Sequence, residues 1–195
     1  MVNLAKGREP QRFRLQDQHQ NQYKDALWLT VDLPVAIIEA REKFITPDES
    51  HLHVAASALD TDRWTDTVPA DKAVLIAAQG LLQYVDGNDV KSLFGKKFPG
   101  ASFMFDLIAK FISDKTMTKQ KHYTVPHMPF GVDRFGAEPL LHSWVDGLEV
   151  EEVPLPLHLL SGVWGYLAPL LAQVPIIRRY QPGFVLQVKF PSPLN

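Results

Sequence analysis

The residues best suited to bind a ligand follow five short apolar runs of the chain. Each run leads into a segment with a glycine, an acidic residue or a hydroxyl-bearing side chain: Gly7, Asp32, Leu59 with Asp60, Gln79 with Gly80 and Tyr84, and Asp106. In open α/β sheets, ligands bind outside the carboxyl ends of the parallel strands. If the runs are strands of one sheet, these residues share one ligand.

The glycines and the tyrosine suit a nucleoside-bearing cofactor. Gly7 and Gly80 lack a Cβ atom, so the backbone can approach a bound molecule closely. The Tyr84 hydroxyl can donate a hydrogen bond to a carboxylate.

The acidic residues complete this interpretation. Asp32 can accept two hydrogen bonds from a ribose diol, as the acidic residue of dinucleotide-binding folds does. Asp60 can accept from an adenine amino group, with Leu59 against the ring face. Structural roles remain open at each position, because Asp32 and Asp60 could cap helices and Gly7 could serve only a turn.

The surrounding pattern predicts the elements that position these residues. Short apolar runs alternate with longer amphipathic stretches, which indicates an α/β fold with a mostly parallel sheet and helices on both faces. Lys72–Ala78 is nearly all apolar, as expected for a central strand. The expected strands are Met1–Leu4, Ala26–Leu33, His51–Ala56, Lys72–Ala78, Ser102–Leu107, Leu148–Val153 and Phe184–Phe190, the last an antiparallel partner of the one before.

Helices are expected over Pro34–Phe44 and Gly87–Phe98, and a further helix leads into a strand within Leu140–Val153. Glu149, Glu151 and Glu152 are expected to be solvated. Residues 113–136 are polar without a clear period, and we expect an irregular lid or substrate wall there.

Composition limits the class of protein. The 195 residues, 46% of them hydrophobic, suit a single domain spanning 1–195. A net charge of −2 argues against nucleic acid as a partner, and the absence of cysteine excludes disulfides and thiolate metal sites. No signal segment or membrane span is recognisable, so we expect a cytoplasmic protein that does not bind membranes.

His51 and His53 share one face of a strand, but no third ligand accompanies them, so no metal is expected.

Five segments together resemble one enzyme family. LAKGREPQRFRL (4–15), VDLP (31–34), SALDTDRW (57–64), AAQGLLQYV (77–85) and FPGASFMFD (98–106) are similar to successive motifs of the leucine carboxyl and polyketide O-methyltransferases. The resemblance covers residues 1 to about 110.

This resemblance implies a class I methyltransferase fold with an antiparallel last strand. It also implies S-adenosylmethionine as cofactor and methyl transfer to a carboxylate or hydroxyl of a small molecule such as a polyketide-type metabolite. The motifs match at Gly7, Asp32, Leu59, Asp60, Gln79, Gly80 and Tyr84, which are therefore the expected cofactor-binding residues. No catalytic base is identified; His127 and Asp133 are candidates.

The chain departs from the family pattern in its first motif. Ala5 replaces the first glycine, Glu9 and Pro10 replace Asp and Thr, and Gln11 replaces an arginine that grips the cofactor carboxylate. Gln79 replaces a glutamate. The helical segment that precedes the first strand in the family is also absent here. We therefore expect weak or no activity from the chain as it stands.

Two other interpretations stay open. A non-catalytic binding module of the same fold would explain the departures in the first motif. An unrelated α/β enzyme could use the same edge for another nucleotide.

Overall fold

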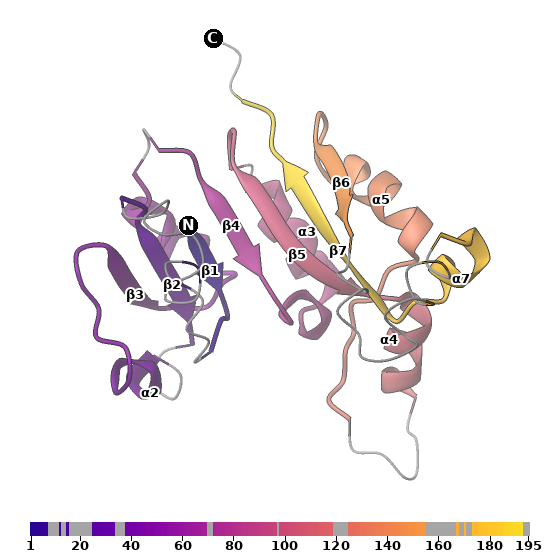
Figure 1. Ribbon diagram of the computed structural model, residues 1–195, viewed down its shortest axis with the longest axis horizontal. Helices are drawn as coiled ribbons and strands as arrows, with labels where there is room; N and C mark the ends of the chain where they lie inside the picture. Colours follow the sequence, from indigo (N-terminus) through magenta and orange to yellow (C-terminus); the bar gives the residue numbers. More distant parts are fainter. Residues whose placement is uncertain are drawn as a thin grey trace.

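The computed structural model describes residues 1–7, 12, 15, 25–33, 38–69, 72–96, 98–118, 125–154, 167, 170 and 173–192. They contain a seven-stranded sheet in the order β3-β2-β1-β4-β5-β7-β6 (Figure 1). Its strands are β1 (Val2–Leu4), β2 (Trp28–Asp32), β3 (His51–Ala55), β4 (Leu75–Ala78), β5 (Ser102–Ile108), β6 (Glu149–Val153) and β7 (Gly183–Lys189).

Strand directions define the edge where a ligand can bind. β1 pairs in parallel with both β2 and β4, β3 continues from β2, and β5 from β4. β7 lies antiparallel between β5 and β6, as the opposed arrow in Figure 1 shows. The chain leaves β1 in one direction and returns to its other side at β4, which creates a topological switch point at the carboxyl ends of β1 and β4. The expected fold class and the antiparallel last strand are confirmed.

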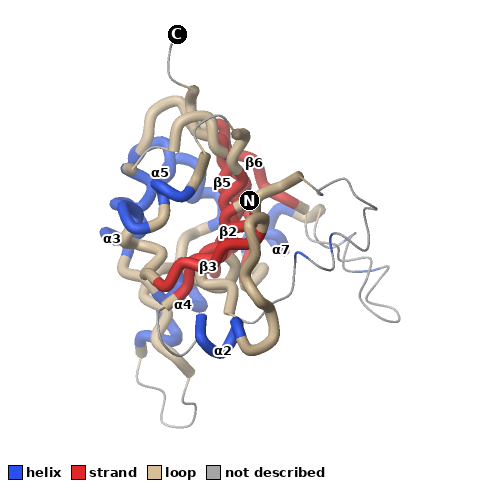
Figure 2. The backbone as a smooth tube through the Cα atoms, turned by 90° about the vertical axis from the view of Figure 1, so that its left-hand side faces the viewer, coloured by secondary structure: helices blue, strands red, loops and turns tan. Residues whose placement is uncertain are grey.

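The helices are short. They are α2 (Glu39–Glu42), α3 (Gly87–Gly95), α4 (Lys110–Met117), α5 (Ala137–Trp144) and α7 (Pro175–Arg179), with 3₁₀ turns η2 (Thr61–Arg63), η3 (Thr65–Thr67), η4 (Leu82–Tyr84) and η5 (Arg134–Gly136). α3 begins at Asp86, whose side chain accepts a hydrogen bond from the Asn88 N–H and so satisfies a free donor of the first turn. α3 and α5 lie behind the sheet in Figure 1, and Figure 2 shows them together on one side of it.

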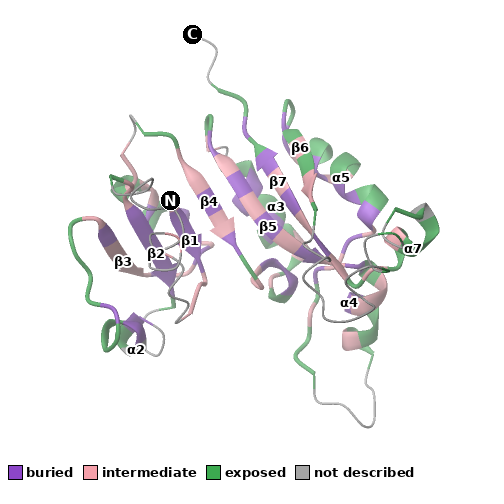
Figure 3. Cartoon of the chain, in the orientation of Figure 1, coloured by how far each residue is buried: buried purple, intermediate pink, exposed green. Residues whose placement is uncertain are grey.

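An aromatic cluster joins these two helices to the sheet. The Phe94 ring of α3 lies 5.3 Å from both Phe103 and Phe105 and 5.8 Å from Trp144 of α5. Phe103 and Phe105 occupy alternate positions of β5, whose buried and half-buried residues alternate along the strand (Figure 3). Alternate residues of β5 and residues at helical spacing in α3 and α5 therefore face one another and bury one continuous core. This core holds the carboxyl edge of the sheet in place.

Three sequence expectations need correction. Residues 110–117 form α4, so the first part of the expected irregular segment is helical. Glu152 is not merely solvated, because it accepts a 2.7 Å hydrogen bond from Arg178 and lies 3.5 Å from Arg134. β4 begins at Leu75 rather than Lys72. Part of the expected helix 34–44 lies outside the described residues, and α2 accounts for its end.

Large exposed apolar side chains lie in four of the connections between strands. In the described part of the chain they all lie in connections that leave the carboxyl ends of β2, β4 and β5, or in the segment that leads into β7: Leu33, Phe44, Tyr84, Met117, Val125, Phe135, Leu167, Leu170, Val174, Ile176, Ile177 and Tyr180. β7 begins opposite Ile108, so its first residue lies at the carboxyl end of β5. None of the described helices is both long and apolar enough to cross a bilayer.

Candidate functional site

Asp32 holds the loop that follows β1. It ends β2 and is 7% exposed. One carboxylate oxygen, Oδ2, accepts a 2.8 Å hydrogen bond from the Gly7 N–H, and Oδ1 accepts one of 2.8 Å from the Leu33 N–H. Each carboxylate oxygen has a further lone pair, so the group can still accept from two ligand hydroxyls.

The loop itself has an unusual backbone. Gly7 has φ +60°, and a Cβ built on it would meet no atom of the described residues within 4 Å, so none of them fills the space beside its backbone. Ala5 also has positive φ, +51°, which glycine adopts more easily. The family's first glycine is thus replaced at a position that keeps the glycine conformation.

A second pair of contacts lies at the end of β4. Gly80, with φ +66°, donates its N–H to Asp106 Oδ1 of β5 at 2.7 Å. Lys6 Nζ donates to Gln79 Oε1 at 3.0 Å and so links the β1 loop to the β4 end across the switch point. The structure therefore joins Gly7 to Asp32 and joins Gln79 to the loop after β1. Gly80 follows Gln79 directly in the chain.

The other expected residues are not joined to this network by the contacts that the structure describes. Leu59 packs against the core, and Asp60 is exposed with Arg63 at 3.9 Å. Asp60 precedes η2 without a side-chain cap, so the capping role considered for it is absent. Tyr84 is 47% exposed at the end of η4. All three follow the carboxyl ends of β3 or β4, on the expected edge.

The candidates for a base and for a substitute cation have other roles. Asp133 caps η5 through the Phe135 N–H and lies 3.3 Å from Arg179, while His127 is exposed. Arg12 lies next to Gln11 in the sequence and could therefore substitute for the family arginine, but it donates to Ser50 at 2.7 Å and lies 3.2 Å from Asp48, ahead of β3. Glu9, Pro10 and Gln11 lie outside the described residues.

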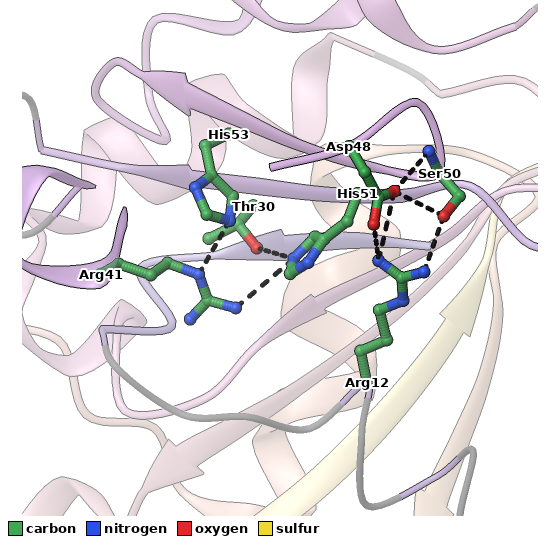
Figure 4. Close-up of polar contacts among 7 residues, drawn as sticks. All are labelled: Arg12, Thr30, Arg41, Asp48, Ser50, His51 and His53. Carbon is green, nitrogen blue, oxygen red and sulfur yellow. Dashed lines mark hydrogen bonds and ion pairs between the residues drawn. The ribbon is translucent and has the colours of Figure 1, made fainter. Parts of the chain in front are cut away.

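Sequence reasoning paired His51 with His53 but missed Arg41, which joins them in a buried cluster (Figure 4). Arg41 of α2 is 3% exposed and donates from Nη1 to the Gly7 carbonyl at 2.9 Å. Its Nε donates to His53 Nε2 at 3.2 Å, and its Nη2 lies 3.5 Å from His51 Nε2. The available signal was spacing: Ile38, Arg41 and Ile45 recur at helical intervals, and all three are buried.

Charge and burial in this cluster favour neutral histidines. Burial lowers the pKa of His51 to about 4, and the neighbouring His53 and Arg41 contribute in the same direction. Burial, with Arg41, also lowers the pKa of His53, although Glu42 opposes this. Hydrogen bonds from the Ser50 hydroxyl and N–H lower the pKa of the neighbouring Asp48 to about 2, and Arg12 contributes in the same direction. The described residues contain no group of three side chains that could hold a metal ion.

Comparison with known proteins places this architecture. Over 84 residues the chain is 30% identical to the tetracenomycin polyketide synthesis O-methyltransferase TcmP of Streptomyces glaucescens, a match covering 42% of this chain and 30% of TcmP. A SAM-dependent methyltransferase from Anabaena variabilis superposes with a TM-score of 0.60 at 12% identity, over 97% of this chain and 76% of that protein. The fold is that of a class I methyltransferase.

Human N-acetylserotonin methyltransferase, solved in complex with SAM, superposes with a TM-score of 0.54 at 11% identity, over 98% of this chain and 47% of that protein. No family model matches the chain. The methyltransferase fold is shared with these proteins, but the match spans less than half the length of TcmP and of the human enzyme.

Proposed function

We propose that this chain binds S-adenosylmethionine at the carboxyl edge of β1, β2 and β4 and acts as an O-methyltransferase. The observation that carries the proposal is the Asp32–Gly7 hydrogen bond, which places an acceptor carboxylate beside a glycine whose neighbouring space no described residue fills. The similarity to TcmP supports the same assignment.

The residues fit the cofactor in chemical type. Asp32 would accept from the ribose hydroxyls while its hydrogen bond to Gly7 keeps the loop in place. Gly7 and Gly80 would allow the backbone to approach the ligand, and Leu59 and Asp60 would meet the adenine. Gln79 and Tyr84 would lie toward the amino-acid end, as the motif order implies. The bound cofactor supplies an electrophilic methyl group.

For the acceptor we propose a small molecule with a hydroxyl or carboxylate, of the apolar, polyketide type. TcmP belongs to polyketide synthesis, and exposed apolar side chains, among them Leu33 after β2 and Tyr84 after β4, follow strands of the proposed cofactor edge. A carboxylate acceptor needs no base, whereas a hydroxyl benefits from one. The protein's part would be to orient the acceptor oxygen toward the methyl group and to exclude water.

Titration calorimetry with S-adenosylmethionine and S-adenosylhomocysteine tests the proposal. We expect saturable binding of both, weakened by about 1 to 3 kcal/mol in Asp32→Ala, because the ribose and the Gly7 N–H lose their acceptor. Asp66→Ala, at an exposed aspartate in η3, is the matched control and should bind as the unaltered chain does. If the folded chain bound neither ligand, the proposal would be refuted, and the chain would be a non-catalytic module with this fold.

A further inference from the structure

The protons of the His53–Arg41 pair can be placed from the geometry. Arg41 Nε donates to His53 Nε2, and a ring nitrogen that accepts a hydrogen bond carries no proton. Neutral His53 therefore carries its proton on Nδ1, which lies 3.4 Å from Glu42 Oε1. The His53 side chain is completely buried. The contact with Arg41 thus requires the neutral ring.

His51 is held in the same way. Its Nε2 faces Arg41 Nη2 and the Thr30 hydroxyl, each at 3.5 Å, and its ring meets His53 edge-on at 4.7 Å between centroids. His51 is 1% exposed. Both histidines thus direct Nε2 toward one buried guanidinium, as Figure 4 shows.

The other end of Arg41 reaches the proposed cofactor site. Its Nη1 donates to the Gly7 carbonyl at 2.9 Å, while the Gly7 N–H donates to Asp32 at 2.8 Å. The Gly7 residue is thus fixed at both its donor and its acceptor. Because Asp32 and Gly7 are the core of the proposed site, the position of Arg41 bears directly on it.

We propose that Arg41 is a positioning residue for the Gly7 loop and that protonation of His53 or His51 releases it, so that acid weakens cofactor binding. This inference rests on the proposed function. A proton on Nε2 turns the acceptor into a donor and sets a second positive charge against the guanidinium where little water screens it. Arg41 then leaves its place, and the Gly7 carbonyl loses its donor.

The surrounding charges set the pH range. Glu42 faces His53 and favours its protonation, while Arg12 opposes and Asp48 favours protonation of His51. The net effect on both rings is a pKa below the ordinary 6.5. We therefore expect Arg41 to be released only below pH 6.5 and the Gly7 loop to stay fixed at neutral pH.

Calorimetry with S-adenosylhomocysteine at pH 7.5 and pH 5 gives the first test. The unaltered chain should bind more weakly at pH 5 than at pH 7.5, and the loss should come from His53, because His51, with a pKa of about 4, stays mostly neutral at pH 5. His53→Gln keeps an acceptor for Arg41 but does not titrate, so its affinity should change much less between the two pH values. His142→Gln, at an exposed histidine of α5, should retain the full pH dependence. Equal pH dependence in His53→Gln and His142→Gln would overturn the inference.

A second measurement needs no cofactor. The amide resonance of Gly7, followed by ¹⁵N NMR in the free protein, should shift between pH 7.5 and pH 5, and His53→Gln should reduce the shift. Arg41→Met should abolish it, and Arg41→Lys, which keeps a donor, should restore part of it. If Arg41→Met does not fold, the His53→Gln comparison decides. A Gly7 resonance insensitive to pH would refute the positioning role, whereas a titrating Gly7 without cofactor binding would refute only the proposed function.

Discussion

Replacing Ala5 by glycine should stabilise the protein. Ala5 follows β1 with φ +51°, in the left-handed region, where the Cβ of an L-residue crowds the following carbonyl. It is the non-glycine residue with positive φ among those the structure describes. Its N–H donates to the Val31 carbonyl at 2.8 Å, and glycine would retain this hydrogen bond.

The magnitude follows from two opposing terms. Left-handed backbone costs a non-glycine residue about 1 to 2 kcal/mol. Glycine has more freedom in the unfolded chain, which costs about 0.5 to 1 kcal/mol on folding. At the midpoints of these ranges the difference is a gain of about 0.75 kcal/mol in the free energy of unfolding for Ala5→Gly. For a chain of 195 residues this raises the Tm by about 1 to 4 °C.

Urea unfolding and calorimetric melting would measure the change. Ala73→Gly is the matched control, because Ala73 is exposed and not in the left-handed region, so glycine should destabilise there. Equal loss of stability in both variants would show that Ala5 is not strained, and the loop geometry drawn here would be wrong.

Three further predictions follow from other sites. His51→Gln should flatten the acid dependence of stability. The pKa of His51 in the folded protein, about 4, lies below the ordinary 6.5, so the unfolded state binds the proton first as the pH falls. The free energy of unfolding of the unaltered protein should therefore fall by about 2 to 3 kcal/mol between pH 6.5 and pH 4, as measured from urea midpoints. Arg134→Met should cost about 2 to 4 kcal/mol in urea unfolding, because the Gly183 and Arg178 carbonyls lose a buried donor; a change below 0.5 kcal/mol would contradict this. Gln11→Arg should raise S-adenosylmethionine affinity about tenfold or more in calorimetry by restoring the ion pair that the family resemblance implies. No gain would show that another group already binds the cofactor carboxylate.

The sheet was predictable because its signal is local. Apolar runs and the alternation within 184–190 gave the strands, and the order of motifs placed Asp32 and Gly80 at strand ends. These features depend on a periodicity of 2 and on residues that punctuate strands, both visible in a short window.

The rest depends on contacts between distant segments. α4 has few apolar residues in its stretch KFISDKTM, and long-range contacts support it: the Ser113 hydroxyl donates to the Met128 carbonyl, and a Cβ on Gly131 would meet Ser113 at 2.4 Å. Arg41 is separated from Gly7 by 34 residues, so no local pattern links them. Cofactor binding stays a prediction for all the site residues: Gly7, Asp32, Leu59, Asp60, Gln79, Gly80 and Tyr84.

The exposed apolar side chains before β7 also give the molecule a preferred surface for adsorption. On a phenyl resin or at an air–water interface, the segment carrying Leu170, Ile176 and Tyr180 would settle against the apolar phase. High concentrations of sulfate strengthen such contacts. Purification by hydrophobic interaction would therefore bring the segment before β7 against the resin, and sulfate would strengthen its retention.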